Sequence, residues 1–155
     1  MKNDNCIFCK IAAGEIPSKT LYEDEKFRVI LDLGPATRGH ALVIPKEHYA
    51  DLYEIPEETA GEAMKVAKKM AAVMTEKLKA DGFNIVQNNG EVSGQSVFHF
   101  HIHLIPRYEG DGHILSWNPG SPSQEELEEV KQQILAFCLR HNYRYDGNSH
   151  WTAAH

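Results

Sequence analysis

Histidine alternates with apolar residues in one short segment, and these side chains carry the clearest chemistry of the sequence. His99, His101 and His103 are separated by Phe100 and Ile102, and the chain holds nine histidines in all. In a β-strand successive side chains point to opposite faces, so the three imidazoles would line one face. Adjacent same-face positions lie ~6.6–6.8 Å apart and the outer pair ~13 Å apart, too far for one shared metal ion. We therefore expect the three histidines to divide between at least two tasks.

Two of these histidines, together with His40, are available for reaction chemistry. Neutral imidazole is a nucleophile that needs no deprotonation at neutral pH. Its natural electrophile is a phosphorus centre with a good leaving group, and the resulting phosphohistidine-type intermediate would be cleaved by water. The loop that begins at Asn88 is rich in glycine and offers backbone N–H donors to a phosphate, to which Gln95 and Ser96 add side-chain donors. Its glycines form neither a Walker nor a Rossmann fingerprint.

The cysteines favour a metal site over a disulfide. Cys6 and Cys9 form a Cys-x-x-Cys pair, and with Cys138 the count is odd, which argues against a disulfide framework. A thioredoxin-like motif would follow a strand, and none is predicted before Cys6. If one end of the histidine strand lies near the pair, the two thiolates can complete a tetrahedral Cys₂His₂ zinc site with His48 and His99. Four protein ligands would close that site and make it structural. Cys138 is expected to be a small core residue.

Composition excludes several classes of protein. The chain has 155 residues, of which 42% are hydrophobic and 25% charged, as in an ordinary soluble domain. Its net charge of -6 does not attract a nucleic-acid backbone or an anionic membrane. No apolar run approaches the ~20 residues that span a bilayer, and the N-terminus lacks the apolar core of a signal peptide. We expect a cytoplasmic protein without nucleic-acid or membrane partners.

Short strands must position these side chains. Apolar runs separated by turn residues predict strands over residues 20–22, 27–31, 40–44, 83–87 and 97–105. In the last of them Phe98, Phe100, Ile102 and Leu104 would enter the core. The first three form an antiparallel meander. Consecutive strands without intervening helices favour an antiparallel α+β fold.

Two principal helices accompany these strands. Pro56 opens a long helix that Gly82 would end, with apolar residues spaced by three and four: Ala60, Met64, Ala67, Ala71, Met74 and Leu78. A capping box of Ser123 and Glu126 opens the second, whose buried side would hold Leu127, Val130, Ile134, Phe137 and Cys138. A short helix is predicted over residues 7–14. No repeat or linker divides the chain, so we expect one domain over residues 1–140 and a tail over 141–155.

Residues 95–105 resemble the signature of the histidine triad (HIT) superfamily, His-φ-His-φ-His-φ-φ with φ apolar, and match it at every position. Asp32, His40 and Asn88 occur in order at familiar separations, and the resemblance covers about two thirds of the chain. The sequence is similar to small bacterial nucleotide-binding HIT hydrolases. This resemblance implies a five-stranded antiparallel sheet with one long helix, here followed by a C-terminal helix, paired into a homodimer.

The resemblance also implies a role for each site residue. His101 would attack the α-phosphorus of a purine nucleotide of the AMP or GMP type, and the carbonyl of His99 would hold its ring in the right tautomer. His103 and His40 would contact the phosphate oxygens and the leaving-group side. The remaining contacts would be Gln95 and Ser96 with phosphate, Asp32 with ribose, Asn88 with the nucleotide, and Ile7, Phe8, Ile30 and Leu33 with the base. Structural zinc would bind Cys6, Cys9, His48 and His99, so that His99 serves the metal and His101 the substrate.

Three functions compete at this point. The resemblance implies a nucleotidyl hydrolase or transferase acting on nucleoside phosphoramidates, with dinucleoside polyphosphates as second choice. The alternative is a nucleotide-binding adaptor with only residual hydrolysis, because the same pocket serves both. A third interpretation makes the histidines a catalytic metal centre, for which chelation would abolish activity and added metal restore it.

Overall fold

The protein divides into two compact units, Met1–Ile114 and Leu115–His155. The computed structural model describes residues 2–112, 115–140, 143–145 and 151–153, with the backbone alone for the residues after 136. The boundary between the units lies before the C-terminal helix, and the division into a domain over residues 1–140 and a tail over 141–155 stays a prediction.

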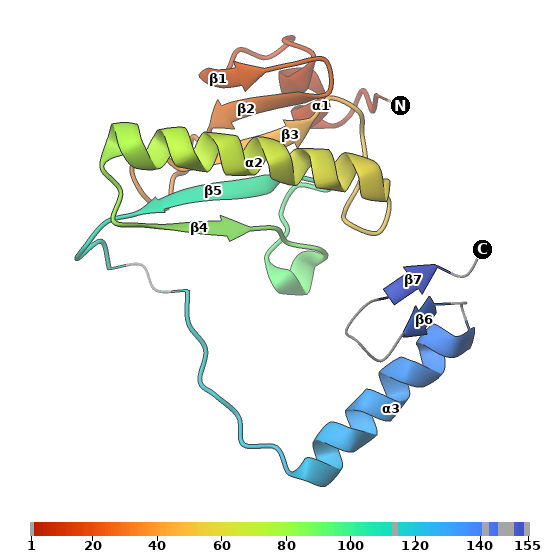
Figure 1. Cartoon of the computed structure of the whole chain (residues 1–155). Coiled ribbons are helices and arrows are strands. Elements are labelled where there is room, and N and C mark those ends of the chain that lie inside the picture. Colours follow the sequence, from red (N-terminus) through yellow and green to blue (C-terminus); the bar gives the residue numbers. More distant parts are fainter. Residues whose placement is uncertain (1, 113–114, 141–142, 146–150, 154–155) are drawn as a thin grey trace. The chain divides into compact units, whose positions relative to one another are not determined.

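Five antiparallel strands form the sheet of the first unit (Figure 1). They are β1 (Thr20–Glu23), β2 (Phe27–Leu31), β3 (Ala41–Pro45), β4 (Gly82–Val86) and β5 (Ile102–Arg107). Their order is β1-β2-β3-β5-β4, so β5 enters between the third strand of the meander and the edge strand β4. The predicted α+β class with a five-stranded antiparallel sheet is confirmed.

Helix α2 (Glu57–Leu78) crosses one face of this sheet (Figure 1). Pro56 precedes it and acidic residues occupy its first turn, where they suit the positive end of the helix dipole. The predicted apolar stripe is wrong at Met64, which is 49% exposed. Of the predicted stripe, Ala67 and Met74 are buried, and the other buried positions are Ala63 and Val66.

The end of α2 also differs from the prediction. Gly82 does not end the helix, which stops at Leu78 when Lys79 adopts a left-handed conformation with φ 56°. The reason lies in the sheet, because Asp81 already donates its N–H to Arg107 O at 2.9 Å and Gly82 pairs with Arg107 as the first residue of β4. Tertiary pairing therefore ends the helix before its glycine.

The histidine segment is a strand only in its second half. Strand β5 was predicted to begin at residue 97 and begins at Ile102, so His99 and His101 lie in irregular backbone before it. The ladder between β3 and β5 runs only from Ala41, opposite Leu104, to Val43, opposite Ile102. Phe100, Ile102 and Leu104 are buried as predicted, whereas Phe98 is 53% exposed and was placed in the core wrongly.

The short helix α1 (Ile7–Ala12) covers the opposite face of the sheet. Its Phe8 and Ala12 form a second core cluster with Ile30, Leu42 and Ile44. The predicted helix over residues 7–14 is thus present but ends at Ala12, and Gly14 follows with φ 80°. This cluster places α1 beside the histidine segment.

The second unit holds α3 (Gln124–Arg140) and a hairpin of β6 (Tyr143–Tyr145) and β7 (Trp151–Ala153), strands that the sequence did not indicate. The capping box is present, with Ser123 N–H 2.6 Å from Glu126 Oε2 and Glu126 N–H 3.1 Å from Ser123 Oγ. The predicted buried side is wrong where it is described: Leu127, Val130 and Ile134 are 49%, 52% and 56% exposed. The side chains of Phe137 and Cys138 lie outside the described residues. Among the described residues, no helix is long and apolar enough to cross a membrane.

Candidate active site and metal site

A cavity of about 320 Å³ opens between α1, β2 and the histidine segment. The predicted site residues that line it are Ile7, Phe8, Ile30, Asp32, Leu33, Ser96, His101 and His103. The structure therefore brings together, from three separate stretches of sequence, most of the residues expected to bind and react with a nucleotide.

Besides His40, two predicted phosphate and nucleotide contacts, Gln95 and Asn88, are not among the residues that line this cavity. The amide of the buried Gln95 is committed to backbone, because its Oε1 accepts from Gly90 N–H at 2.8 Å and its Nε2 donates to Ala50 O at 2.7 Å. Asn88 lies near Gly94 in the same loop. Both residues thus shape the loop before the histidines, and their contact with a substrate stays a prediction.

Other lining residues were missed by the sequence analysis. They are Ile11, Ile16, Pro17, Ser18, Lys19, Leu31, Leu42 and Val97. Leu42 could have been found, because it lies two residues after His40 and shares its face of the strand. The segment 16–19 carries no local pattern that predicts its place at the cavity.

The ring of His101 is held in one tautomer. Its Nδ1 lies 2.7 Å from the carbonyl oxygen of His99. A carbonyl can only accept, so Nδ1 donates and the lone pair of the neutral ring is on Nε2. The ring of Phe8 packs edge-on against His101 at 5.0 Å between centroids. Burial lowers the pKa of His101, which keeps this nucleophilic form at neutral pH.

A chain of hydrogen bonds runs through the other two reaction histidines. Ala36 donates its N–H to His40 Nδ1 at 3.0 Å, so the proton of the neutral His40 ring is on Nε2. That Nε2 lies 2.9 Å from His103 Nδ1 and donates to it. Because His103 accepts at Nδ1, the single N–H proton of its neutral ring is on Nε2. We call this chain, from Ala36 N–H through His40 to His103, the relay.

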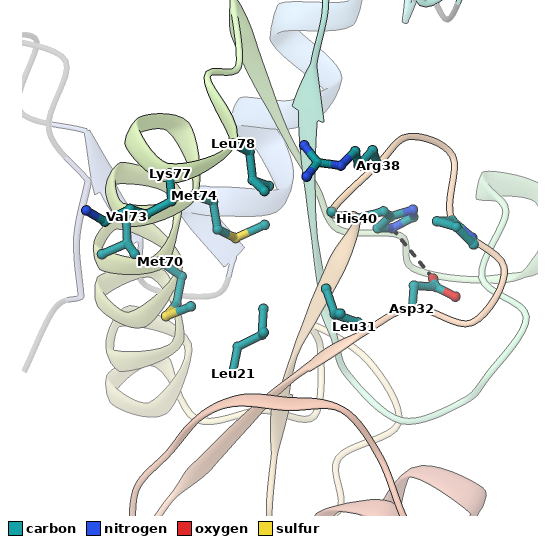
Figure 2. Close-up of a pocket in the computed structure, with 12 residues that line it drawn as sticks. Leu21, Leu31, Asp32, Arg38, His40, Met70, Val73, Met74, Lys77 and Leu78 are labelled. Carbon is teal, nitrogen blue, oxygen red and sulfur yellow. Dashed lines mark ion pairs between the residues drawn. The ribbon is translucent and has the colours of Figure 1, made fainter.

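Electrostatics keep the relay neutral. Burial, helped by the neighbouring His101 and His40, lowers the pKa of His103 to about 4. Burial also lowers the pKa of His40, although the carboxylate of Asp32, 3.6 Å from His40 Nε2, opposes the shift (Figure 2). At neutral pH both rings are therefore neutral, and each has a defined donor and acceptor.

A second cluster gathers Cys6, Cys9, His48 and His99, whose four donor atoms lie within 4.8 Å of one another. We call it the Cys/His cluster. Zinc bonds of ~2.3 Å to sulfur and ~2.0–2.1 Å to nitrogen at tetrahedral angles separate donor atoms by ~3.3–3.8 Å. The observed separations are 3.4 Å from Cys6 Sγ to His99 Nδ1, 3.3 Å from Cys9 Sγ to His48 Nδ1 and 3.2 Å from His48 Nδ1 to His99 Nδ1. The donor set therefore fits zinc.

His99 is prepared for the metal by its outer nitrogen. Its Nε2 lies 2.8 Å from Pro45 O, which can only accept, so Nε2 holds the proton and Nδ1 turns its lone pair toward the thiols. Burial lowers the pKa of His99 to about 4, and this favours the neutral ring that a metal requires. Burial raises the pKa of the Cys9 thiol, so metal binding would release its proton.

Asp32, His40 and His103 also bring three potential metal ligands within 4.8 Å. The arrangement bears on the interpretation of the histidines as a catalytic metal centre. The nitrogen of His40 that faces this group carries its proton, because Ala36 occupies the other nitrogen. A metal would have to displace that proton and break the bond to Ala36. The geometry thus suits proton donation better than metal coordination.

A larger cavity of about 530 Å³ lies between the C-terminal half of α2 and the ends of β1 and β2 (Figure 2). It is lined mainly by apolar side chains, and of the reaction residues it touches only Asp32 and His40. His101 and His103 line the smaller cavity, which we therefore take as the candidate active site.

Comparison with known families agrees with this geometry. Residues 13–110 match the model of the HIT domain. The chain belongs to the HIT family. The resemblance noted from the histidine segment is thereby confirmed, and the segment 99–103 is the histidine triad of a HIT protein.

Relatives of this HIT protein include an enzyme and solved structures. It is 43% identical to the adenosine 5′-monophosphoramidase HNT1 of Saccharomyces cerevisiae, with 84% of this chain and 81% of the relative covered. It superposes with a TM-score of 0.80 on a HIT family protein from Bacillus subtilis, at 43% identity and covering 86% and 96% of the two chains. A zinc-bound histidine triad protein from Mycobacterium smegmatis gives a TM-score of 0.68, at 41% identity and covering 86% and 97%.

Proposed function

We propose that this HIT protein hydrolyses nucleotides at their α-phosphorus through a covalent intermediate on His101. The observation that carries the proposal is the bond from His101 Nδ1–H to His99 O, which leaves an unprotonated Nε2 on a ring that lines the cavity. A relative with 43% identity is named an adenosine 5′-monophosphoramidase, which supports adenosine nucleotides with a P–N linkage as the first substrate class.

The reaction would proceed in two displacements. In the first, Nε2 of His101 attacks the α-phosphorus, a nitrogen–phosphorus bond forms, and the bond to the leaving group breaks. The leaving amine departs after taking up a proton. In the second, water attacks the same phosphorus, the bond to His101 breaks, and the nucleoside monophosphate is released. The neutral Nε2–H of His103 can donate to the phosphoryl oxygens as negative charge develops on them.

The rest of the cavity supports recognition of a nucleotide. The carboxylate of Asp32 lies at its wall and can accept hydrogen bonds from ribose hydroxyls. Phe8 and Ile30 offer apolar surface to a base, and Ile7 and Leu33 are 51% and 95% exposed at its edge. Ser96 supplies a hydroxyl donor next to the histidines. These assignments support recognition of a nucleotide by the proposed hydrolase.

Zinc in the Cys/His cluster would have a structural role. It would close on four protein ligands with no position left for a substrate. The cluster joins α1, the turn after β3 and the histidine segment, so a bound ion would fix the elements around His101. We further propose that the protein acts as a homodimer, as its family resemblance implies.

The experiment compares hydrolysis of adenosine 5′-phosphoramidate with that of diadenosine tetraphosphate, for the wild type and His101→Ala. We expect AMP release from at least one substrate, and a loss of roughly 10⁴–10⁶-fold in the variant, the range found when a nucleophile is removed. The variant should still bind AMP. Full turnover by His101→Ala would refute the nucleophile assignment.

The same experiment separates the hydrolase from the adaptor. Tight AMP binding by the wild type with negligible turnover of both substrates would favour a nucleotide-binding adaptor. A covalent nucleotidyl adduct on His101, isolated after rapid acid quench, would support the two-step reaction independently of the steady-state rate.

A further inference from the structure

Thr37 lies in the loop that leads to His40, and its hydroxyl is engaged inside the protein. The residue is only 8% exposed, and its Oγ1–H donates to Pro106 O at 2.6 Å. Pro106 belongs to β5, three residues after His103, and is itself buried. The Thr37 hydroxyl therefore ties the loop before His40 to the strand that carries the other relay histidine.

The loop around Thr37 is also fixed internally. Asp32 accepts from Gly34 N–H at 2.8 Å on Oδ1, and His40 donates its N–H to Thr37 O at 3.1 Å. Gly39, at φ 90°, packs so closely on Leu78 that a Cβ there would lie 2.4 Å from the leucine Cδ1. Two side-chain bonds hold this loop to β5 and the residue after it: the Thr37 hydroxyl donates to Pro106 O inside the protein, and the Tyr108 hydroxyl donates to Arg38 O in an exposed bond of 2.7 Å.

We propose that Thr37 is a positioning residue, whose hydroxyl holds the loop against β5 so that His40, its tautomer locked by Ala36 N–H, can donate to His103. Its effect on rate rests on the proposed hydrolase function, whereas its effect on the tautomer of His103 does not. The relay needs bonds of 3.0 Å and 2.9 Å. The first of them lies within the loop, and the second joins the loop to β5, the two elements that the Thr37 hydroxyl joins.

Removing only the hydroxyl should disturb this geometry. Thr37→Val keeps the shape but leaves the buried Pro106 carbonyl without its donor, so the loop is expected to shift toward another partner. A displacement of ~1 Å can cost about a hundredfold in rate. Thr37→Ser retains the hydroxyl and should restore the bond.

The primary experiment reads tautomers by ¹⁵N NMR of histidine-labelled protein without nucleotide. In the wild type we expect His40 and His103 each to carry the proton on Nε2. In Thr37→Val we expect signals averaged between tautomers for His103, while His40 should keep its proton on Nε2 because its bond to Ala36 lies within the loop. Thr37→Ser and the exposed control Thr20→Val should match the wild type. With nucleotide substrate, kcat of Thr37→Val should fall roughly tenfold to a hundredfold with a smaller change in KM, and Thr37→Ser should recover it.

Several outcomes would overturn the inference. A proton on Nδ1 of His40 in the wild type would do so at once. Thr37→Val with wild-type tautomers would reduce Thr37 to a structural residue, whatever its activity. If Thr37→Val does not fold, His40→Ala provides the test, since His103 should then lose its fixed tautomer, and an unchanged His103 signal would refute the relay. Absence of turnover by the wild type, with the expected tautomer changes intact, would refute the proposed function alone.

Discussion

The Cys/His cluster and the relay both contain buried histidines, but their ring protons point in opposite directions. The proton of His99 points away from the Cys/His cluster, whereas the proton of His40 points toward its relay partner His103. At the Cys/His cluster, His99 Nε2–H donates a hydrogen bond to Pro45 O, so the lone pair on Nδ1 faces the thiols. At the relay, Ala36 N–H occupies the outer nitrogen of His40, so the proton points inward to His103. A carbonyl behind an imidazole thus prepares it as a ligand, whereas an N–H behind it prepares it as a donor. Residue type alone does not distinguish the two.

His99 connects these two regions through different parts of the same residue. Its side chain belongs to the Cys/His cluster, and its carbonyl holds the ring of His101. A shift of His99 would therefore move the ring of His101, even though a metal ion in the Cys/His cluster would not contact the phosphate. This link explains how a structural metal could influence a reaction in which it takes no step.

The largest expected effect comes from breaking the Cys/His cluster. Cys9→Ala should abolish binding of one zinc ion per chain and lower the free energy of unfolding by about 4 kcal/mol, in the range caused by loss of a structural metal. Zinc content and urea denaturation measure both quantities. His101→Ala serves as the matched control, because it should retain zinc. A Cys9→Ala protein that keeps its zinc and its stability would disprove the metal assignment.

The next largest effect is expected from a substitution in the relay, which should lower activity without affecting the Cys/His cluster. His103→Phe keeps an aromatic ring but removes the donor aimed at the developing charge, so kcat should fall about a hundredfold, as when one oxyanion donor is lost. Its zinc content and thermal midpoint should stay close to those of the wild type. Loss of zinc in this variant would show that the two clusters are not independent.

The smallest effect is expected from pH. Burial lowers the pKa of His103 to about 4 and also lowers the pKa values of His40 and His101, so these rings stay neutral to a lower pH than an ordinary histidine. The hydrolysis rate should therefore change less than about twofold between pH 7.5 and about 6.5, where an ordinary histidine would already be half charged. A rate that halves near pH 6.5 would contradict neutral, buried relay histidines.

The same lowered pKa values give a sign to the pH dependence of stability. Below about pH 6.5 the histidines become protonated in the unfolded chain but stay neutral in the folded protein. The free energy of unfolding therefore declines as the pH falls from there toward about 4. The urea midpoint measured across this interval checks the direction. Rising stability on acidification would require a native partner that charges these rings.

The sequence predicted which reactive side chains lie together more accurately than it predicted the ends and buried faces of the helices and strands. The triad, the strands of the meander and the four residues of the Cys/His cluster were all predicted from residue type and spacing. The errors concern ends and faces: α2 stops before Gly82, Met64 is exposed, and β5 begins only at Ile102. Each error arises because pairing or packing with a distant segment overrides a local preference.

The C-terminal helix shows the same limit. Its capping box is read correctly because it depends on two residues within one turn. Its apolar stripe predicted a buried face, whereas Leu127, Val130 and Ile134 are about half exposed in the single chain. Periodicity indicates which face of a helix is apolar but does not indicate what covers it.

By itself, the sequence determined that this protein has an antiparallel α+β fold and a histidine segment whose three side chains are too far apart to share one metal ion. It also determined which cysteines and histidines could share a metal. Only the tertiary structure decided the protonation of each ring, because the deciding partners are backbone groups of Ala36, Pro45 and His99. Every residue but proline carries the same N–H and every residue the same C=O, so their identity holds no signal until folding places them beside a particular imidazole.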